Sequence, residues 1–300
     1  MSRKIVSLFL ALLLMLGMTA ALAENGAVTV TDMYGRQTTL SEPVTRIVAL
    51  TPADCEILCA LGCGQALVGR GAYCDYPASV LELPAVQSGA ETNVEEILAL
   101  NPQVVLMGDM AQSKELVNAL EENGVHVVLS DANSIEETYT AIRMIGALMG
   151  KDDEAQALIA DMQDTFAEIA AKSESTGKTV YFEVSPLQYG LWTAGSNTFM
   201  DELATICGLT NAFADVEGWG AISEEQVLAR DPDYIVTISM YFGEGPTPVE
   251  EILGRNGWES LKAVSGAQVF NADSNAVSRP GPRLKDAAVE LFQFVNGQND

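Results

Sequence analysis

The sequence predicts an α/β protein of two similar lobes with mainly parallel sheets, joined by one long rigid helix. Short apolar runs suited to strands alternate with runs suited to helices, a rhythm that favours parallel pairing. Residues 95–106 (EEILALNPQVVL) recur as residues 225–236 (EQVLARDPDYIV). Between the two copies, residues 153–172 follow helical spacing without a Gly or Pro.

Residues 1–23 have the pattern of a cleaved signal peptide. Arg3 and Lys4 precede an apolar run over residues 5–21, and Ala23 closes the small-x-small pattern that signal peptidase requires. A transmembrane anchor is the alternative, but the run is short and ends in a cleavage pattern. No Cys follows Ala23 directly, as a lipid-modified start would need. We therefore expect an exported, soluble chain that begins near Glu24.

An N-terminal α/β lobe is expected over residues 24–150. Its predicted strands span residues 46–50, 103–107 and 125–130, and its predicted helices span residues 54–61, 94–100 and 113–123. Residues 151–177 form the connecting helix and a short linker. A helix over residues 153–172 would be about 30 Å long and would resist bending, so we expect only a small closure of the lobes.

A C-terminal α/β lobe is expected over residues 178–300. Strands are predicted at residues 179–184, 234–239 and 268–271, and helices at residues 198–207, 224–230 and 283–295. Both lobes are thus predicted to be Rossmann-like. In each copy of the repeat a capped helix, a proline break and an apolar strand follow one another, and the pairs Asn93/Glu96 and Ser223/Gln226 fit the capping box. Chance similarity of two helix-Pro-strand joints is the alternative.

Composition excludes some partners. The chain is 48% hydrophobic, enough for two cores, and its formal charge of -25 becomes -27 once Arg3 and Lys4 leave with the signal peptide. Such an acidic surface repels nucleic acid and anionic lipid, whereas a basic patch on a partner protein would attract it. We expect the mature chain to act as a monomer.

The cysteines and the single histidine are assigned to packing. Cys55, Cys59 and Cys63 recur at helical spacing, where a mutual disulfide would be strained, so we expect a buried stripe and no metal site. Cys74 and Cys207 are left without an assigned partner. His126 lies in the apolar run VHVVL and is expected to be a packed strand residue.

The sequence bears on three functional classes: an enzyme, a surface adhesion module and a binding protein. It holds no GxSxG, HExxH or GxGxxG motif, which disfavours an enzyme, although an exported enzyme remains an alternative. A surface adhesion module fits export but does not explain two mirrored lobes joined by a rigid helix. A binding protein that holds a ligand between its lobes explains both features.

The chain resembles the substrate-binding proteins of ATP-driven (ABC) importers for iron-siderophores, haem and cobalamin, the class III type with a helical backbone. The resemblance rests on RIVALTPADCEILCALGCGQALVG, on YCDYP at residues 73–77, on both repeats and on SRPGPRL at residues 278–284. It implies a protein of the periplasm or of the extracytoplasmic face of a bacterial cell. Such a protein would deliver a metal chelate to a permease and its ATPase, with no cofactor beyond the iron or cobalt of its cargo.

The resemblance also implies that one glutamate on each lobe docks into arginine pockets of the permease. The matching residues are Glu95 and Glu225. Each would lie in the first turn of a capped helix, where the helix dipole favours an exposed carboxylate. The alternative is that they are ordinary acids of a helix start, and the neighbours Glu96 and Glu224 could share the role.

Cargo is expected between the lobes, where loops leave the carboxyl ends of the strands. Flat rings suit a macrocycle or an aromatic chelate, and a cation there could meet an anionic complex. By resemblance Tyr73 and Trp219 match cobalamin-contacting positions, but an aromatic residue expected near Gly89 is missing, which favours an iron chelate. The main candidates are Tyr73, Tyr76, Trp192, Trp219, Met240, Tyr241 and Arg279, with Thr51, Pro52, Tyr189 and residues 108–110 and 242 beside them.

Overall fold

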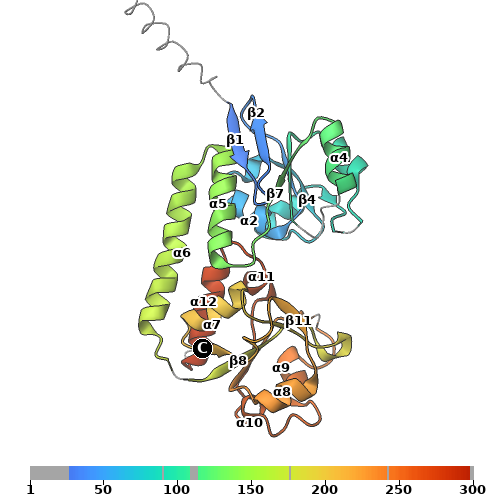
Figure 1. Ribbon diagram of the computed structural model, residues 1–300. Coiled ribbons are helices and arrows are strands. Elements are labelled where there is room, and N and C mark those ends of the chain that lie inside the picture. The colour runs from blue at the N-terminus through green and yellow to red at the C-terminus, as the bar shows by residue number, and fades with distance from the viewer. Residues whose placement is uncertain (1–26, 90, 109–113, 176, 242, 298–300) are drawn as a thin grey trace, which may run out of the picture.

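The computed structural model describes residues 27–297 except 90, 109–113, 176 and 242. Two α/β lobes lie end to end, and the long helix α6 (Asp152–Lys172) runs beside both of them (Figure 1). The predicted signal peptide lies outside the described residues. Within the described residues no helix is long and apolar enough to cross a membrane. The predicted class, two α/β lobes with mainly parallel sheets and one long joining helix, is confirmed.

The N-terminal lobe is built on a five-stranded sheet in the order β5-β4-β3-β6-β7, and every pairing in it is parallel. The strand β6 is buried along its whole length, as expected for a parallel strand covered on both faces. An antiparallel hairpin, β1 (Val28–Thr31) and β2 (Gln37–Leu40), precedes the sheet. The other elements are β3 (Ile47–Ala49), α2 (Pro52–Ala60), η1 (Gly64–Ala66), β4 (Leu67–Gly71), η2 (Ala78–Glu82), β5 (Ala85–Val86), α3 (Val94–Ala99), β6 (Val104–Met107), α4 (Lys114–Glu122), β7 (His126–Leu129) and α5 (Ile135–Met149).

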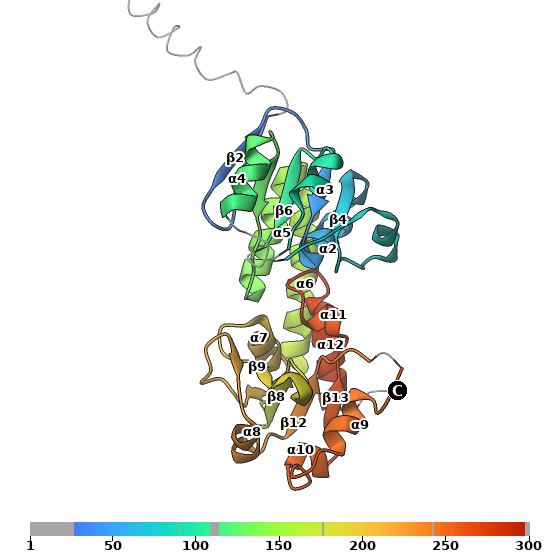
Figure 2. The same cartoon turned by 90° about the vertical axis from the view of Figure 1, so that its right-hand side faces the viewer.

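The C-terminal lobe has a four-stranded parallel sheet in the order β10-β8-β12-β13 (Figure 2). A separate antiparallel pair, β9 (Trp192–Ala194) and β11 (Trp219–Ala221), lies beside it. The other elements are β8 (Thr179–Glu183), η4 (Leu187–Tyr189), α7 (Phe199–Ile206), β10 (Thr210–Asn211), α8 (Glu224–Arg230), β12 (Tyr234–Thr237), α9 (Pro248–Leu253), α10 (Lys262–Ser265), β13 (Val269–Asn271), α11 (Ser274–Val277) and α12 (Leu284–Val295).

The repeated segment occupies equivalent places in the two lobes. In the first lobe α3 leads into β6, which pairs with the first sheet strand β3 and with β7. In the second lobe α8 leads into β12, which pairs in the same way with β8 and β13. The predicted capping box is complete at Ser223 and Gln226. At α3 it is only half formed, because Asn93 caps the helix but the Glu96 carboxylate accepts from the Gln87 backbone N–H at 3.2 Å.

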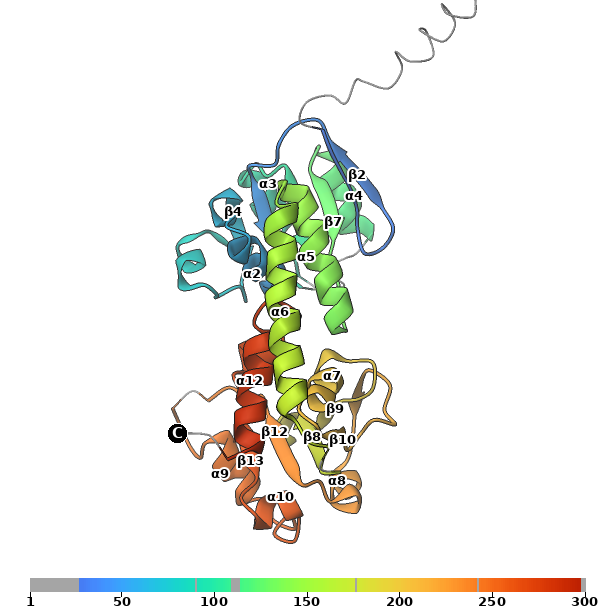
Figure 3. The ribbon, with the colours of Figure 1, turned by 90° about the vertical axis from the view of Figure 1, so that its left-hand side faces the viewer.

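Helix α6 joins the cores of the two lobes. It packs on α5 in the first lobe and on α12 in the second (Figure 3). Its apolar face, with Ile159, Met162, Phe166 and Ile169, is buried in one cluster that contains residues of both lobes. Burying such side chains stabilises by about 1.5–3 kcal/mol each, so this face anchors the helix to both lobes.

Two packing predictions need correction. Helix α2 ends at Ala60, so Cys63 is buried just beyond the helix and not on its face, and Cys59 is only half-buried. All five cysteines are unbonded. His126 does lie in a strand, but it is the first residue of β7 and is exposed, because the burial of this strand begins at Val127. The prediction that His126 packs inside the lobe was wrong.

Candidate functional site: a cavity between the lobes

A cavity of about 630 Å³ lies between the two lobes. On the N-terminal side its wall consists of residues that follow the carboxyl ends of β3, β4, β5, β6 and β7. On the C-terminal side residues after β12 and β13 meet the first residue of β11. The lining residues are Leu50, Thr51, Pro52, Ala53, Tyr73, Ser88, Gly89, Gly108, Ser130, Asp131, Ala132, Asn133, Trp219, Met240, Asn275, Ser278, Arg279 and Pro280.

The cavity therefore lies where parallel sheets commonly bind ligands, outside the carboxyl ends of their strands. Four of the main candidates line it: Tyr73, Trp219, Met240 and Arg279. Tyr73 and Met240 are 71% and 62% exposed, and Trp219 is 37% exposed with its ring tilted against that of Phe199 at 5.5 Å between centroids. These three side chains present apolar surface that a ligand would cover.

The other three main candidates lie outside this lining. The Arg283 guanidinium lies over the Tyr76 ring, with its Cζ 4.2 Å from the ring centroid, so Tyr76 already makes a cation–π contact. Trp192 lies at the far end of the β9–β11 pair, opposite Ala221. The Tyr241 hydroxyl donates to the Gly245 carbonyl at 3.3 Å. Of the accessory candidates, Thr51, Pro52 and Gly108 line the cavity, Tyr189 does not, and residues 109, 110 and 242 lie outside the described residues.

A buried carboxyl group lies directly behind the cavity wall. Thr51 caps α2, and its hydroxyl donates to Asp54 Oδ2 at 2.6 Å while it accepts from the Asp54 backbone N–H. The other oxygen, Asp54 Oδ1, is buried and has no hydrogen-bond partner among the described groups. Burial raises the pKa of Asp54 to about 6, and the hydroxyl groups of Thr51 and Ser130 oppose this only in part. Asp54 thus changes its protonation near neutral pH.

Arg279 takes part in an ion network that joins the lobes. Its Nη1 donates to Glu56 Oε1 at 3.0 Å and to Asp75 Oδ1 at 2.6 Å, and its Nη2 donates to the Tyr73 carbonyl at 3.3 Å. Arg283 donates to both oxygens of Glu56, at 2.8 and 2.7 Å. Glu56 itself is 3% exposed. Two arginines of one lobe therefore converge on a buried carboxylate of the other.

Glu95 and Glu225 are exposed at matching places in the first turns of α3 and α8. Figure 2 shows these helices away from the place where the lobes meet. The Glu225 backbone N–H and the Ser223 hydroxyl hold the pKa of the Glu225 carboxyl below its usual value. The neighbouring acids are engaged within their own lobes, because Glu96 accepts from Gln87 and Glu224 accepts from Trp258 Nε1 at 3.0 Å.

Some lining residues were missed by the sequence reasoning. Ser130, Asp131 and Asn133 follow β7, and the rule on carboxyl ends could have indicated them, because a strand was predicted at residues 125–130. Asn275 and Ser278 lie on or just after α11, a short helix that the sequence pattern did not indicate.

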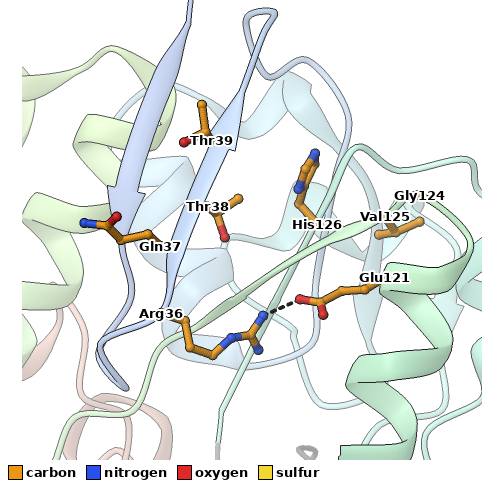
Figure 4. A pocket seen from close by; sticks show the side chains of 8 residues that line it. All are labelled: Arg36, Gln37, Thr38, Thr39, Glu121, Gly124, Val125 and His126. Carbon is orange, nitrogen blue, oxygen red and sulfur yellow. Dashed lines mark hydrogen bonds and ion pairs between the residues drawn. The ribbon is translucent and has the colours of Figure 1, made fainter.

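Another cavity, of about 410 Å³, lies on the N-terminal lobe between β2, the end of α4 and the start of β7. Figure 4 shows its polar wall, with Arg36 turned toward Glu121 and His126 near Thr38. Arg36 is ion-paired with Glu121, so its charge is already balanced. Among the described residues, no group of three or more His, Cys, Asp or Glu side chains is placed to hold a metal ion.

Comparison with known proteins identifies the family. Residues 47–276 match the family described as periplasmic binding protein. An uncharacterised ABC transporter substrate-binding lipoprotein of Bacillus subtilis is 32% identical over 275 residues, 89% of this chain and 85% of that protein. The vitamin B12-binding protein of Salmonella choleraesuis is 31% identical over 258 residues, covering 85% of this chain and 91% of that protein.

A solved structure agrees with these relatives. It is that of a possible iron-binding (periplasmic solute-binding) protein from Staphylococcus epidermidis, with a TM-score of 0.72 and 29% identity, over 84% of this chain and 98% of that one. The family match spans both lobes and the helix α6 between them. The chain belongs to the periplasmic binding protein family.

Proposed function

We propose that this chain is the substrate-binding protein of an ABC importer, which captures a metal chelate between its lobes and delivers it to a permease and its ATPase. The observation that carries the proposal is the cavity between the lobes, at the carboxyl ends of both parallel sheets and walled in part by Tyr73, Trp219 and Met240. Aromatic and thioether side chains suit the flat or apolar surface of a macrocycle or chelate. Relatives that share both lobes include an ABC transporter substrate-binding lipoprotein and vitamin B12-binding proteins.

Export through a cleaved leader is part of the proposal. Residues 1–23 would leave as a signal peptide, and the mature monomer would work outside the cytoplasmic membrane without a lipid anchor. The Bacillus subtilis relative is a lipoprotein, so anchoring has to be tested directly. The intact mass and first residue of the exported protein decide this, because a lipid adds mass to an N-terminal Cys.

Docking would use Glu95 and Glu225. Their exposure, their matching first-turn positions and the excess acid of the chain support contact with a basic surface. Glu96 and Glu224 are less suited because each accepts a hydrogen bond from another segment of its lobe, whereas the contacts of Glu225 lie at the start of its own helix. A catalytic role or an adhesive role would not require acids at equivalent places in both lobes.

The test is a pair of double variants. Glu95→Ala with Glu225→Ala should abolish uptake of the chelate in cells that lack the wild-type protein, while the affinity of the purified chain stays unchanged. The matched control replaces Glu115 and Glu259, one exposed glutamate on each lobe outside α3 and α8, and should transport normally. Normal uptake by the first double variant would remove Glu95 and Glu225 from the mechanism.

A further inference from the structure

The charged groups in and behind the cavity wall include more carboxylates than cations. Among the described residues that line it, Arg279 and Asp131 carry formal charges at neutral pH. Arg279 is the one cation of this set, and alone it would suggest an anion-binding site. Its surroundings decide whether its charge is available to a ligand.

Arg279 is already paired on two sides. Its side chain is 11% exposed, and its Nη1 lies between Glu56 Oε1 and Asp75 Oδ1. Burial by itself raises the pKa of Asp75, but the hydrogen bond and charge of Arg279 outweigh burial and hold the pKa below its usual value. An anionic ligand would have to displace Asp75 to reach this guanidinium.

The network as a whole carries an excess negative charge. Glu56, Asp75 and Asp273 supply three carboxylates, whereas Arg279 and Arg283 supply two guanidinium groups. Charge-assisted pairs of this kind hold their geometry, so the arginines are not free to turn into the cavity without losing these bonds.

The opposite wall adds further negative charge. Asp131 lines the cavity there, with one oxygen accepting from the Tyr34 hydroxyl at 3.0 Å. Asp54 lies behind the wall and is largely ionised above neutral pH. The formal charge of the whole chain, -25, makes the surrounding field negative as well.

We propose that this cavity selects uncharged or cationic chelates over polyanionic ones, and that Glu56 and Asp75 determine this selectivity by neutralising Arg279. The proposal rests on the proposed function and narrows its cargo. A ferric hydroxamate or a corrinoid rich in amides would meet hydroxyl and amide groups from Thr51, Ser88, Asn133 and Asn275 without crossing a charge barrier. A ferric tris-catecholate, or a haem with ionised propionates, would bring its own negative charge close to Asp131 and to the excess carboxylate of the ion network.

The experiment measures affinity against ligand charge. The purified mature chain is titrated with cationic ferrioxamine B, cyanocobalamin, ferric enterobactin and haem, by calorimetry and by Trp fluorescence. We expect the best uncharged or cationic probe to bind at least about tenfold more tightly than either anionic probe at low salt, with the gap narrowing at high salt.

Variants then test the role of Asp75. Asp75→Asn keeps the shape of an exposed side chain and releases the charge of Arg279, so affinity for the anionic probes should rise by about tenfold while affinity for the others stays within about twofold. The matched control is Asp215→Asn, which breaks the comparable exposed pair with Arg230 on the C-terminal lobe and should change no affinity.

The outcomes separate the inference from the function it rests on. Tighter binding of an anionic probe by the wild-type chain, or an Asp75→Asn variant with an unchanged preference, overturns the inference alone. If none of the four probes binds, the proposed function fails and the inference fails with it. A charge preference that disappears in Asp75→Asn and persists in Asp215→Asn supports both.

Discussion

Replacing Glu56 with Ala should destabilise the protein by about 3 kcal/mol, because it removes the carboxylate on which two arginines of the other lobe converge. The side chains of Glu56, Arg279 and Arg283 are only 2%, 11% and 12% exposed. Removing one partner of a buried ion pair costs about 3–5 kcal/mol, since the remaining charge is left desolvated. The lower end applies here because Asp75 and Asp273 remain 2.6 and 3.6 Å from the two guanidinium groups.

Two controls separate charge from shape and burial from exposure. Glu56→Gln keeps the size of the side chain and one acceptor oxygen but loses the charge, so it should cost less, about 1–2 kcal/mol. Asp215→Asn breaks an ion pair whose carboxylate is 66% exposed, so it should destabilise the protein far less than either change at Glu56.

The assay is urea unfolding at pH 7, followed by circular dichroism and by Trp fluorescence. Both signals are needed because Trp192, Trp219 and Trp258 all belong to the C-terminal lobe, whereas circular dichroism reports both lobes. A loss below about 1 kcal/mol in Glu56→Ala would refute the reasoning. It would show that α6 and the apolar cores hold the lobes together without help from the ion network.

Three further predictions concern proton binding, cargo and lobe motion. Burial raises the folded-state pKa of Asp54 to about 6, above its ordinary value of 3.8, so the free energy of unfolding should fall by about 3 kcal/mol as the pH rises from below 4 to above 6. Urea unfolding at several pH values should show a smaller dependence on pH in Asp54→Asn, and an unchanged dependence would exclude Asp54 as its source. Trp219→Ala should weaken chelate binding, measured by calorimetry, by about 1–3 kcal/mol. Trp192 lies outside the cavity lining, so Trp192→Ala should leave the affinity unchanged. Equal effects of the two substitutions would contradict the placement of the ligand at Trp219. Solution scattering should show only a small fall in radius of gyration on ligand binding, because α6 packs on both lobes. The Glu202 carboxylate of the C-terminal lobe also accepts from the Ile135 N–H of the N-terminal lobe at 2.6 Å. A large fall would show that α6 bends.

Much of the fold could be predicted from the sequence because its strands are short continuous apolar runs between helices. The predicted strands at residues 46–50, 103–107 and 125–130 correspond to β3, β6 and β7 within one residue at each end. The missed strand β4 (LVGRG) contains two glycines and an arginine, so it lacks that signal. Helix α5 was also missed, although one of its sides is apolar and buried; it ends at Gly150, just before α6.

Residues of the cavity wall could be predicted where they directly follow a strand that the sequence indicates. Thr51 and Gly108 lie on loops that leave β3 and β6, two strands that the sequence indicates, so a rule about the ends of strands predicts them. Tyr73 follows β4, which was missed, and was indicated by the resemblance of the segment YCDYP. Tyr76, on the same segment YCDYP, and Trp192, after the predicted strand at residues 179–184, were also candidates but lie outside the described cavity lining. Their positions depend on how a loop folds back, as where Tyr76 meets Arg283, and residue spacing does not encode that contact.

The ion pairing of Arg279 depends on how the two lobes face each other. Its partner Glu56 is 223 positions away in the sequence, and the two side chains meet only because α6 fixes how the lobes face each other. Taken alone, an arginine at a predicted ligand site suggests an anionic ligand. One signal in the sequence did point to the pairing. Glu56 lies, like Asp54, among the apolar residues of ADCEILCA, and a buried acid either takes up a proton, as burial favours for Asp54, or pairs with a cation. The segment SRPGPRL supplies two such cations, Arg279 and Arg283, and in the structure both donate to Glu56.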